Sequence, residues 1–246
     1  TGKSGRQTRR FLDHMGTEVV DHLVISHQGY DHAGGADEVI STKTVEKVYD
    51  NGMISYPDGY LGKAGLSHLG RGDIINGEGY TLEVLHPYKG FYTSFGSPSS
   101  SDNNSSLVLR LRYHGVAVLF TGDIEAEAED DLISTGEYLR SDIIKVPHHG
   151  SSTSSSSAFV NAVSPSVAVI SSGMFNPYGH PHKGTIDNLE GVRIINTSEA
   201  GAVKISVGGD SDSAVISIKT YESERIGSAD SLQDELENII KLFSVW

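Results

Sequence analysis

Residues that can bind a metal ion lie close together in one short segment, residues 26–35. Its ionisable side chains are His27, Asp31 and His32, and zinc and manganese accept imidazole nitrogen and carboxylate oxygen as ligands. The segment follows an apolar run at residues 23–25, which is typical of a buried strand. A strand would deliver these side chains to one rim of a sheet. The pattern favours a metal site, although two surface histidines at a strand end would produce it too.

Two further strand-like runs also end in candidate ligands. Residues 116–120 lead to Asp123, and residues 143–146 lead to the pair His148 and His149. Each has an ordinary explanation by itself, because an Asp after Thr-Gly often caps a helix and a His pair often packs in a core or on a surface. The recurrence of such residues at three strand ends favours one shared site.

His180 is a further candidate, after a predicted strand at residues 167–170 and directly before Pro181. At the same rim it would contact a phosphate or act as a general acid, whereas a loop histidine that hydrogen-bonds backbone carbonyls would look the same in sequence. The serine-rich run at residues 151–157 also has two interpretations, a phosphate contact or a flexible linker.

The bulk composition limits the classes of function. The chain of 246 residues contains no cysteine, which excludes disulfides, thiolate metal ligands and a cysteine nucleophile. No stretch approaches the ~18 apolar residues of a membrane helix, so we expect no membrane insertion by this chain. The net charge of −13 argues against broad, nonspecific adhesion to nucleic acid, but not against a small site in which metal ions supply the positive charge.

Strand and helix patterns alternate along the chain and would position the candidate ligands. Helical patterns lie at residues 5–15, 36–40, 124–133, 158–163 and 232–243, and strand patterns at 19–25, 45–49, 80–85, 107–113, 116–120, 143–146, 167–170, 192–195, 203–207 and 214–218. Residues 51–71 and 88–106 show weak periodicity and are expected to be irregular. Strand pairs mixed with helices predict an α/β fold, in which two sheets form a sandwich with helices outside, an αββα layering.

The spacing of His27, Asp31 and His32, with small residues after them, resembles the metal-binding motif of the metallo-β-lactamase superfamily, His-x-His-x-Asp-His. The chain departs from it at Gly29, where the superfamily has a second His, or an Asp in some branches. The superfamily usually opens with a β-hairpin that ends in Asp-Thr-Gly, and the first two residues, Thr-Gly, match its tail. The resemblance therefore implies a metallo-β-lactamase-type sandwich at residues 1–220 without its opening hairpin. A C-terminal helical extension at 221–246 would follow.

Four later blocks resemble one branch of that superfamily, the ComEC family of competence DNA-uptake channels and its soluble relatives. They are Asn-Asn-Ser-Ser-Leu-Val-Leu-Arg-Leu at residues 103–111, Leu-Phe-Thr-Gly-Asp at 119–123, Lys-Val-Pro-His-His-Gly-Ser at 145–151 and Tyr-Gly-His-Pro-His at 178–182. The resemblance extends from about Phe11 to Gly208. A ComEC-like chain would be a piece of a longer protein, would lie outside the cytoplasm, and would adjoin a membrane channel domain of the same parent protein.

The resemblance also implies a set of metal ligands, with Asp123 as the carboxylate that bridges two ions. The implied ligands are His27, Asp31, His32, Asp123 and His149, with His148 as the less favoured alternative to His149. One site would be nearly complete, whereas the site around His27 lacks a ligand at Gly29 and has Asn103 where many members have histidine. An amide oxygen suits Mn²⁺ better than Zn²⁺. Either ion is expected, as one or two ions, and a degenerate site is the remaining alternative.

The function that this resemblance implies is a metal-dependent phosphodiesterase or nuclease that acts on DNA, or on another phosphodiester, during competence-type DNA uptake. A divalent ion would activate water and neutralise charge on the phosphoryl oxygens. Asp31 or the bridging Asp123 would orient the water, and His180 would contact the phosphate or protonate the leaving oxygen. The alternative is a degenerate module with a role in interaction or assembly and no catalysis.

Overall fold

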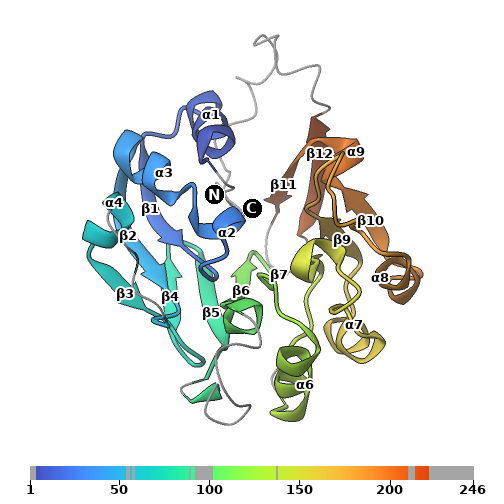
Figure 1. Cartoon of the computed structure of the whole chain (residues 1–246). Helices are drawn as coiled ribbons and strands as arrows, with labels where there is room; N and C mark the ends of the chain where they lie inside the picture. The colour runs from blue at the N-terminus through green and yellow to red at the C-terminus, as the bar shows by residue number, and fades with distance from the viewer. Residues whose placement is uncertain are drawn as a thin grey trace.

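The computed structural model describes residues 4–53, 56, 59–88, 90–91, 102–136, 138–209 and 214–221. In these residues the strands form three sheets (Figure 1). The first has the order β1-β2-β3, the second the order β10-β9-β8-β7-β6-β5-β4, and the third pairs β11 with β12. None of the helices in this part of the chain combines the length and the apolar character that a membrane span requires.

The first sheet is parallel and carries helices on its outer face. Its strands are β1 (Val19–Val24), β2 (Thr44–Asp50) and β3 (Leu66–His68). The helices are α1 (Arg6–His14), α3 (Ala36–Thr42) and α4 (Tyr60–Lys63), which contribute to one apolar cluster with β1 and β2. The short helix α2 (Tyr30–Ala33) lies between β1 and α3. Leu12 of α1 and Val39 of α3 pack there against Leu23, because each helix turns one apolar face toward the sheet.

The second sheet is antiparallel along one half and parallel along the other. The antiparallel strands are β4 (Ile74–Gly77), β5 (Tyr80–His86), β6 (Val108–Tyr113) and β7 (Val116–Phe120), and the parallel ones are β8 (Ile143–Lys145), β9 (Val167–Ile170) and β10 (Arg193–Asn196). β8 and β9 are buried along their whole length, as strands covered on both faces must be. His114 and Gly115 take positive φ in the tight turn between β6 and β7, which confirms the predicted hairpin.

Helices cover the outer face of this sheet, and the two larger sheets meet through their inner faces. The covering helices are α6 (Ala126–Ser134), α7 (Ser157–Val163) and α8 (Lys183–Asn188), and Leu132 and Phe159 pack with Leu119 and Ile144 of the sheet. On the inner side, Tyr49 of the first sheet joins Leu109 of the second in another apolar cluster.

The third sheet, β11 (Ala202–Gly208) with β12 (Val215–Tyr221), packs through Val207 on the inner face of the second sheet and follows the short helix α9 (Thr197–Ala200). The predicted αββα sandwich of the metallo-β-lactamase type is thereby confirmed.

Two predictions of local structure were wrong in part. Residues 51–71 contain α4 and β3, and β4 was not predicted at all. Both strands are short and largely exposed, so they depend on pairing with β2 and β5 rather than on an apolar pattern of their own. The helix expected from residue 124 begins at Ala126 with Glu125 as its N-cap, so Asp123 caps no helix. The expectations for Thr1, Gly2 and the helix at 232–243 lie outside the described residues.

Candidate metal centre

The candidate ligands come from three strand ends that lie at one rim of the sandwich. His27 follows β1, and Asp31 and His32 lie on α2 directly after it. Asp123 follows β7, and His149 lies in the short 3-10 helix η3 (Pro147–Gly150) after β8. In Figure 1, α2 faces the ends of β7 and the neighbouring strands near the middle of the view. Tertiary structure therefore brings together residues that are about a hundred positions apart in sequence.

Four side chains point their ligand atoms at one another, and we call them the His149 cluster: Asp31, His32, Asp123 and His149. Asp123 Oδ2 lies 3.0 Å from His32 Nε2 and 3.4 Å from His149 Nε2. Asp31 Oδ2 lies 3.3 Å from His149 Nε2, and the two Nε2 atoms are 3.4 Å apart. Two carboxylates and two imidazoles thus converge on one small volume.

His27 belongs to a second, overlapping group. One ring nitrogen of His27, one of His32 and a carboxylate oxygen of Asp123 lie within 4.8 Å of one another. The ring is buried and its centroid lies 4.3 Å from that of His32. Its Nδ1 is 3.1 Å from the hydroxyl of Ser106, which also accepts a hydrogen bond of 3.0 Å from the backbone N–H of Asp123. The two groups share His32 and Asp123, the arrangement that a bridging carboxylate requires.

Two features of these residues fit a divalent cation: the type of their ligand atoms, and a buried carboxylate oxygen of Asp123 to which no described donor is hydrogen-bonded. Within the described part of the chain, no donor is hydrogen-bonded to the buried Oδ1 of Asp123, and Lys145 Nζ lies 3.8 Å away. Such an oxygen is costly to bury unless a cation or a donor meets it. His149 Nδ1 donates to the carbonyl of Ser171 at 2.7 Å, so its Nε2 can present a lone pair to the cluster. Zn²⁺ and Mn²⁺ both accept this mixture of imidazole and carboxylate.

The departure from the motif at Gly29 has a steric counterpart. A Cβ built on Gly29 would lie 2.5 Å from Nε2 of His27. The backbone of Gly29, with φ −44° and ψ 134°, is open to any residue. The imidazole of His27 therefore occupies the space that a ligand side chain at this position would need.

Charges inside the cluster are strongly coupled. The hydrogen bond from His149 lowers the pKa of Asp31. Burial by itself would lower the pKa of His149, but hydrogen bonds to Asp123 and Asp31 outweigh it and raise that pKa to about 9. Burial, reinforced by His32, lowers the pKa of His27 to about 3. Without a metal ion, protonated His149 is the cation that the two carboxylates share, and a bound metal would take over that role.

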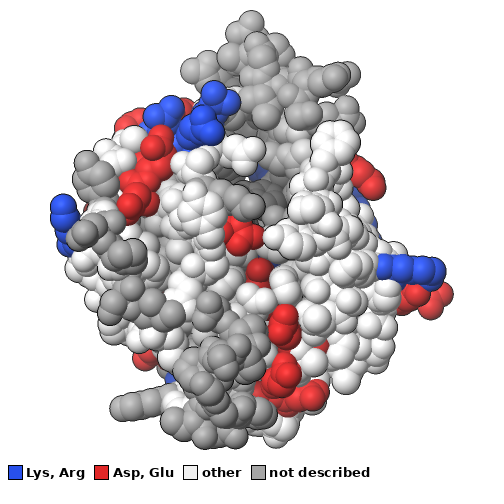
Figure 2. All heavy atoms as spheres, in the orientation of Figure 1, with Lys and Arg blue, Asp and Glu red and all other residues white. Residues whose placement is uncertain are grey.

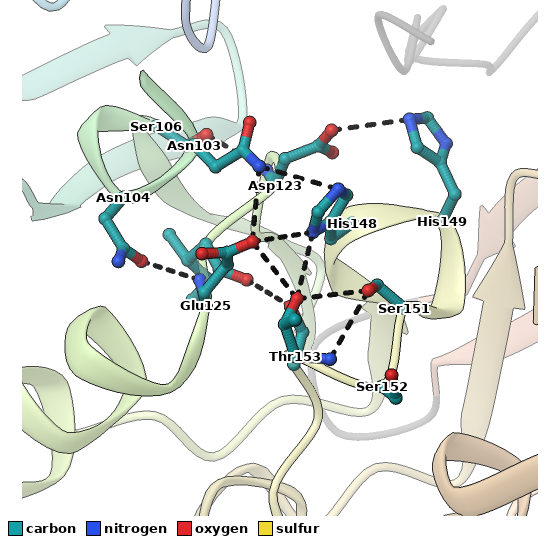
Figure 3. Close-up of polar contacts among 12 residues, drawn as sticks. Asn103, Asn104, Ser106, Asp123, Glu125, His148, His149, Ser151, Ser152 and Thr153 are labelled. Atoms are coloured by element: carbon teal, nitrogen blue, oxygen red, sulfur yellow. Dashed lines mark hydrogen bonds and ion pairs between the residues drawn. The ribbon is translucent and has the colours of Figure 1, made fainter. Parts of the chain in front are cut away.

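His148 lies outside the converging ligands, in a separate group that we call the His148 cluster: Asn103, Glu125, His148 and Thr153 (Figure 3). His148 Nδ1 lies 3.2 Å from Glu125 Oε1 and 3.2 Å from Thr153 Oγ1. Asn103 and Thr153 both donate to the same carboxylate oxygen, at 3.3 Å and 3.1 Å. The structure thus places His149, the favoured candidate, among the ligand atoms, and it turns the side chain of Asn103 toward Glu125.

His180 lies beside both clusters. Its ring is nearly parallel to that of His149, with centroids 6.4 Å apart, and lies 5.8 Å from the ring of His148. Burial, followed by the charges of His182 and His148, lowers the pKa of His180 to about 4. The ring is therefore neutral near pH 7, which makes it a poor proton donor there. A hydrogen-bonding or stacking role fits a neutral imidazole better than general-acid catalysis.

Three residues of the site were missed in the sequence. Ser26 and Ser106 hold the ring of His27, and the ammonium of the buried residue Lys145 lies 3.8 Å from Asp123 Oδ1 and donates to the carbonyl of Gly122. Burial lowers the pKa of Lys145, while Asp123 opposes that change. A lysine inside the apolar run at 143–146 was the available signal, because lysine is seldom buried without a partner.

The amino-acid sequence of the chain is similar to a known protein family and to curated proteins. The family model described as "Metallo-beta-lactamase superfamily" matches residues 4–173. ComE operon protein 3 of Bacillus subtilis (strain 168) is 30% identical over 79% of this chain and 25% of its own length. Competence protein ComA of Neisseria gonorrhoeae is 32% identical over 80% of this chain and 27% of its own length. The chain therefore spans about a quarter of the curated relatives that it matches.

A solved structure shares the fold. The crystal structure of Tm1679, described as a metal-dependent hydrolase of the beta-lactamase superfamily, superposes with a TM-score of 0.51 at 16% identity, over 80% of this chain and 83% of that one. At this level of identity the likeness concerns the fold alone.

Proposed function

The chain belongs to the metallo-β-lactamase superfamily, whose members are metal-dependent hydrolases, and from this premise we propose that it hydrolyses phosphodiester bonds in DNA during competence-type DNA uptake. The observation that carries the proposal is the convergence of Asp31, His32, Asp123 and His149 on one small volume, in which Oδ2 of Asp123 lies between Nε2 of His32 and Nε2 of His149. The similarity to ComE operon protein 3 and competence protein ComA supports a role in competence, and DNA is the substrate that we propose for that role.

The ligands in this proposal are the residues of the His149 cluster, with His27 available to a second ion. A bound Zn²⁺ or Mn²⁺ would supply an activated water and neutralise phosphoryl charge. Asp31 is the cluster carboxylate open to solvent, with 46% of its side chain exposed against 5% for Asp123. Asp31 can therefore orient the attacking water and accept its proton, while Asp123 stays buried and fixed between His32, His149 and Lys145.

His180 has the role of a phosphate contact in this proposal. Its neutral ring offers one N–H to a phosphoryl oxygen, and its backbone is held by Asn176, whose amide oxygen accepts from the N–H of His180 at 2.8 Å. We place the chain outside the cytoplasm, beside a membrane channel domain of the same parent protein. This placement rests on the competence relatives, of which the chain spans about a quarter.

A second candidate function is an interaction or assembly module without catalysis. The feature that favours it is the His27 side of the site, where Gly29 supplies no ligand and the side chain of Asn103 is held by Glu125. One ion would still fit the other side, so the two functions differ in whether a metal is retained.

Metal content and hydrolysis together test the proposal. Purified protein, loaded with Mn²⁺ or Zn²⁺ and desalted, should retain about one to two equivalents by mass spectrometry. The loaded protein should cleave a single-stranded oligonucleotide and bis-p-nitrophenyl phosphate, and Asp123→Asn should abolish both activities. Retained metal without cleavage of either substrate, or the absence of retained metal, would favour the interaction module.

A further inference from the structure

Exposed apolar side chains gather next to the candidate metal centre. In the described residues, four of the nine exposed large hydrophobic side chains lie in two segments beside the ligands. Tyr30, 70% exposed, directly precedes Asp31. Met174, Phe175 and Tyr178 are 62%, 91% and 69% exposed and lie on the segment that leads to His180. This concentration at one rim calls for a ligand with an apolar surface.

The segment that carries these side chains is held by hydrogen bonds. The side-chain amide of Asn176 donates to the carbonyls of Gly173 and His180, each at 2.8 Å. Beyond it, the backbone N–H of His182 donates to the carbonyl of Gly150 at 2.9 Å, and His182 Nδ1 accepts from the backbone N–H of Ser152 at 2.9 Å. The aromatic rings are therefore displayed by a supported loop.

One of these rings is connected to the ligand set by stacking. Tyr178 lies over His180 with ring centroids 5.7 Å apart and an interplanar angle of 24°. His180 in turn lies over His149 with an angle of 16°. A ladder of three nearly parallel rings thus runs from solvent to a candidate ligand. Tyr178 remains 69% exposed, so an open aromatic surface stands at the outer end of the ladder.

Electrostatics around the centre favours stacking over ionic contacts as the source of substrate affinity. Figure 2 shows acidic side chains along the middle of this face, with the visible Lys and Arg mostly toward its margins. An acidic surface repels a phosphodiester backbone everywhere except at a bound cation. A substrate that also offers a flat ring can gain affinity from Tyr178 without any basic residue.

We propose that Tyr178, with Phe175 on the same loop, is a stacking subsite for an unpaired nucleobase next to the scissile phosphate. The inference rests on the proposed function and narrows its substrate class to single-stranded nucleic acid. In a duplex each base is stacked on both sides by its neighbours, so only an unpaired strand can present a free base to the ladder. In this proposal Tyr178 contacts a base of the substrate and determines specificity, whereas the metal-binding residues act at the substrate's phosphate.

The test compares two oligonucleotides of equal length. One has normal bases throughout, and in the other the nucleotides around the cleavage site are abasic. For metal-loaded Tyr178→Leu, we expect the ratio of kcat/KM on the normal strand to that on the abasic strand to fall by about 10-fold, the size of one lost base–aromatic stack. Tyr178→Phe should keep the ratio, because it keeps the ring. Tyr138→Leu, which removes a tyrosine of 58% exposure from another part of the surface, is the matched control.

A second readout does not depend on catalysis. An oligonucleotide with 2-aminopurine should lose fluorescence on binding the unmutated protein, and lose less on binding Tyr178→Leu. Cleavage with an unchanged ratio and unchanged quenching in Tyr178→Leu would overturn the subsite, leave the phosphodiesterase intact and assign the aromatic rim to a protein partner. Quenching through Tyr178 without any cleavage would keep the subsite and remove the proposed catalysis. Absence of both cleavage and quenching would overturn both.

Discussion

His148 and His149 are neighbours in sequence, and both take left-handed backbone angles, with φ of 47° and 55°, yet they join groups of opposite character. In the His148 cluster, donors meet acceptors: Asn103 and Thr153 both donate to Glu125. In the His149 cluster, two imidazole nitrogens face each other at 3.4 Å, and no donor among the described residues is hydrogen-bonded to the buried Oδ1 of Asp123. The first group is complete as it stands, and the second becomes complete when a cation binds.

The comparison teaches that residue type alone does not identify a ligand. In both groups a histidine that follows β8 meets a carboxylate that follows β7, His148 with Glu125 and His149 with Asp123. The difference lies in unsatisfied atoms, since a metal site keeps lone pairs available whereas a structural network uses them up.

The largest expected effect is the loss of metal from the His149 cluster. His32→Ala and Asp123→Ala should each abolish metal retention, because each removes a ligand that the His149 cluster shares with the group around His27. His148→Ala should retain the metal of the unmutated chain. Mass spectrometry of desalted protein measures the content, and circular dichroism checks that each variant is folded. Equal metal content in all three variants would remove the distinction between the two clusters.

The next effect concerns His180, which lies between the clusters. His180→Ala should keep its metal and lose activity by about 10- to 100-fold, the value of one hydrogen bond to a charged group. Because the pKa of His180 is lowered to about 4, we expect equal losses on an oligonucleotide and on bis-p-nitrophenyl phosphate. A much larger loss on the oligonucleotide, whose leaving group needs a proton, would instead assign His180 to general-acid catalysis.

A smaller effect is expected at Gly29. Gly29→Asp adds the ligand that the motif lacks and should raise metal content from one ion toward two, provided that the ring of His27 turns away from the new Cβ. Gly29→Ala meets the same crowding without offering a ligand, so it should stay at the content of the unmutated chain. A loss of metal in both variants would mean that His27 cannot move.

The smallest effect on the metal centre should come from the network behind the His148 cluster. Buried His86 lies 3.5 Å from Asp131 and 2.9 Å from the carbonyl of Asn104, and Asp131 also pairs with Arg71. Asp131→Asn should leave metal content unchanged and lower the free energy of unfolding by about 1–3 kcal/mol, as expected for a buried partner left unpaired.

The stabilisation that Asp131 contributes should depend on pH in a definite direction. Burial would raise the pKa of Asp131, but His86 and Arg71 outweigh it and hold that pKa below the ordinary value of 3.8. The stabilisation by Asp131 is therefore present above that value and lost as the pH falls through the lower, folded-state pKa. Urea unfolding of the unmutated chain and Asp131→Asn should converge as the pH falls below that range. If the difference in free energy of unfolding between the two proteins stayed constant with pH, the carboxylate charge of Asp131 would not be the source of the stabilisation.

The sequence predicted what depends on local pattern. Apolar runs located β1, β7, β8 and β9, and because their ends carry His27, Asp123 and His149, the candidate ligands followed from the strand boundaries. Contacts between distant segments could not be predicted this way. The three-residue strand β3 forms because it pairs with β2. The side chains of His148 and His149 separate because both residues adopt left-handed backbone angles, which the local sequence does not require.

The hydroxyl of Ser106 faces Nδ1 of His27 at 3.1 Å, and that of Ser26 faces the same atom at 3.3 Å. The Ser106 hydroxyl accepts from the backbone N–H of Asp123, and its one hydrogen is then free to point at Nδ1 of His27 or away from it. When it points at Nδ1, the neutral imidazole carries its hydrogen on Nε2 and has no lone pair left for an ion. When it turns away, Nδ1 can carry the hydrogen, and Nε2 then keeps a lone pair. The orientation of the hydroxyl hydrogens of Ser106 and Ser26, which both face Nδ1, would thus decide whether Nε2 of His27 could serve as a ligand.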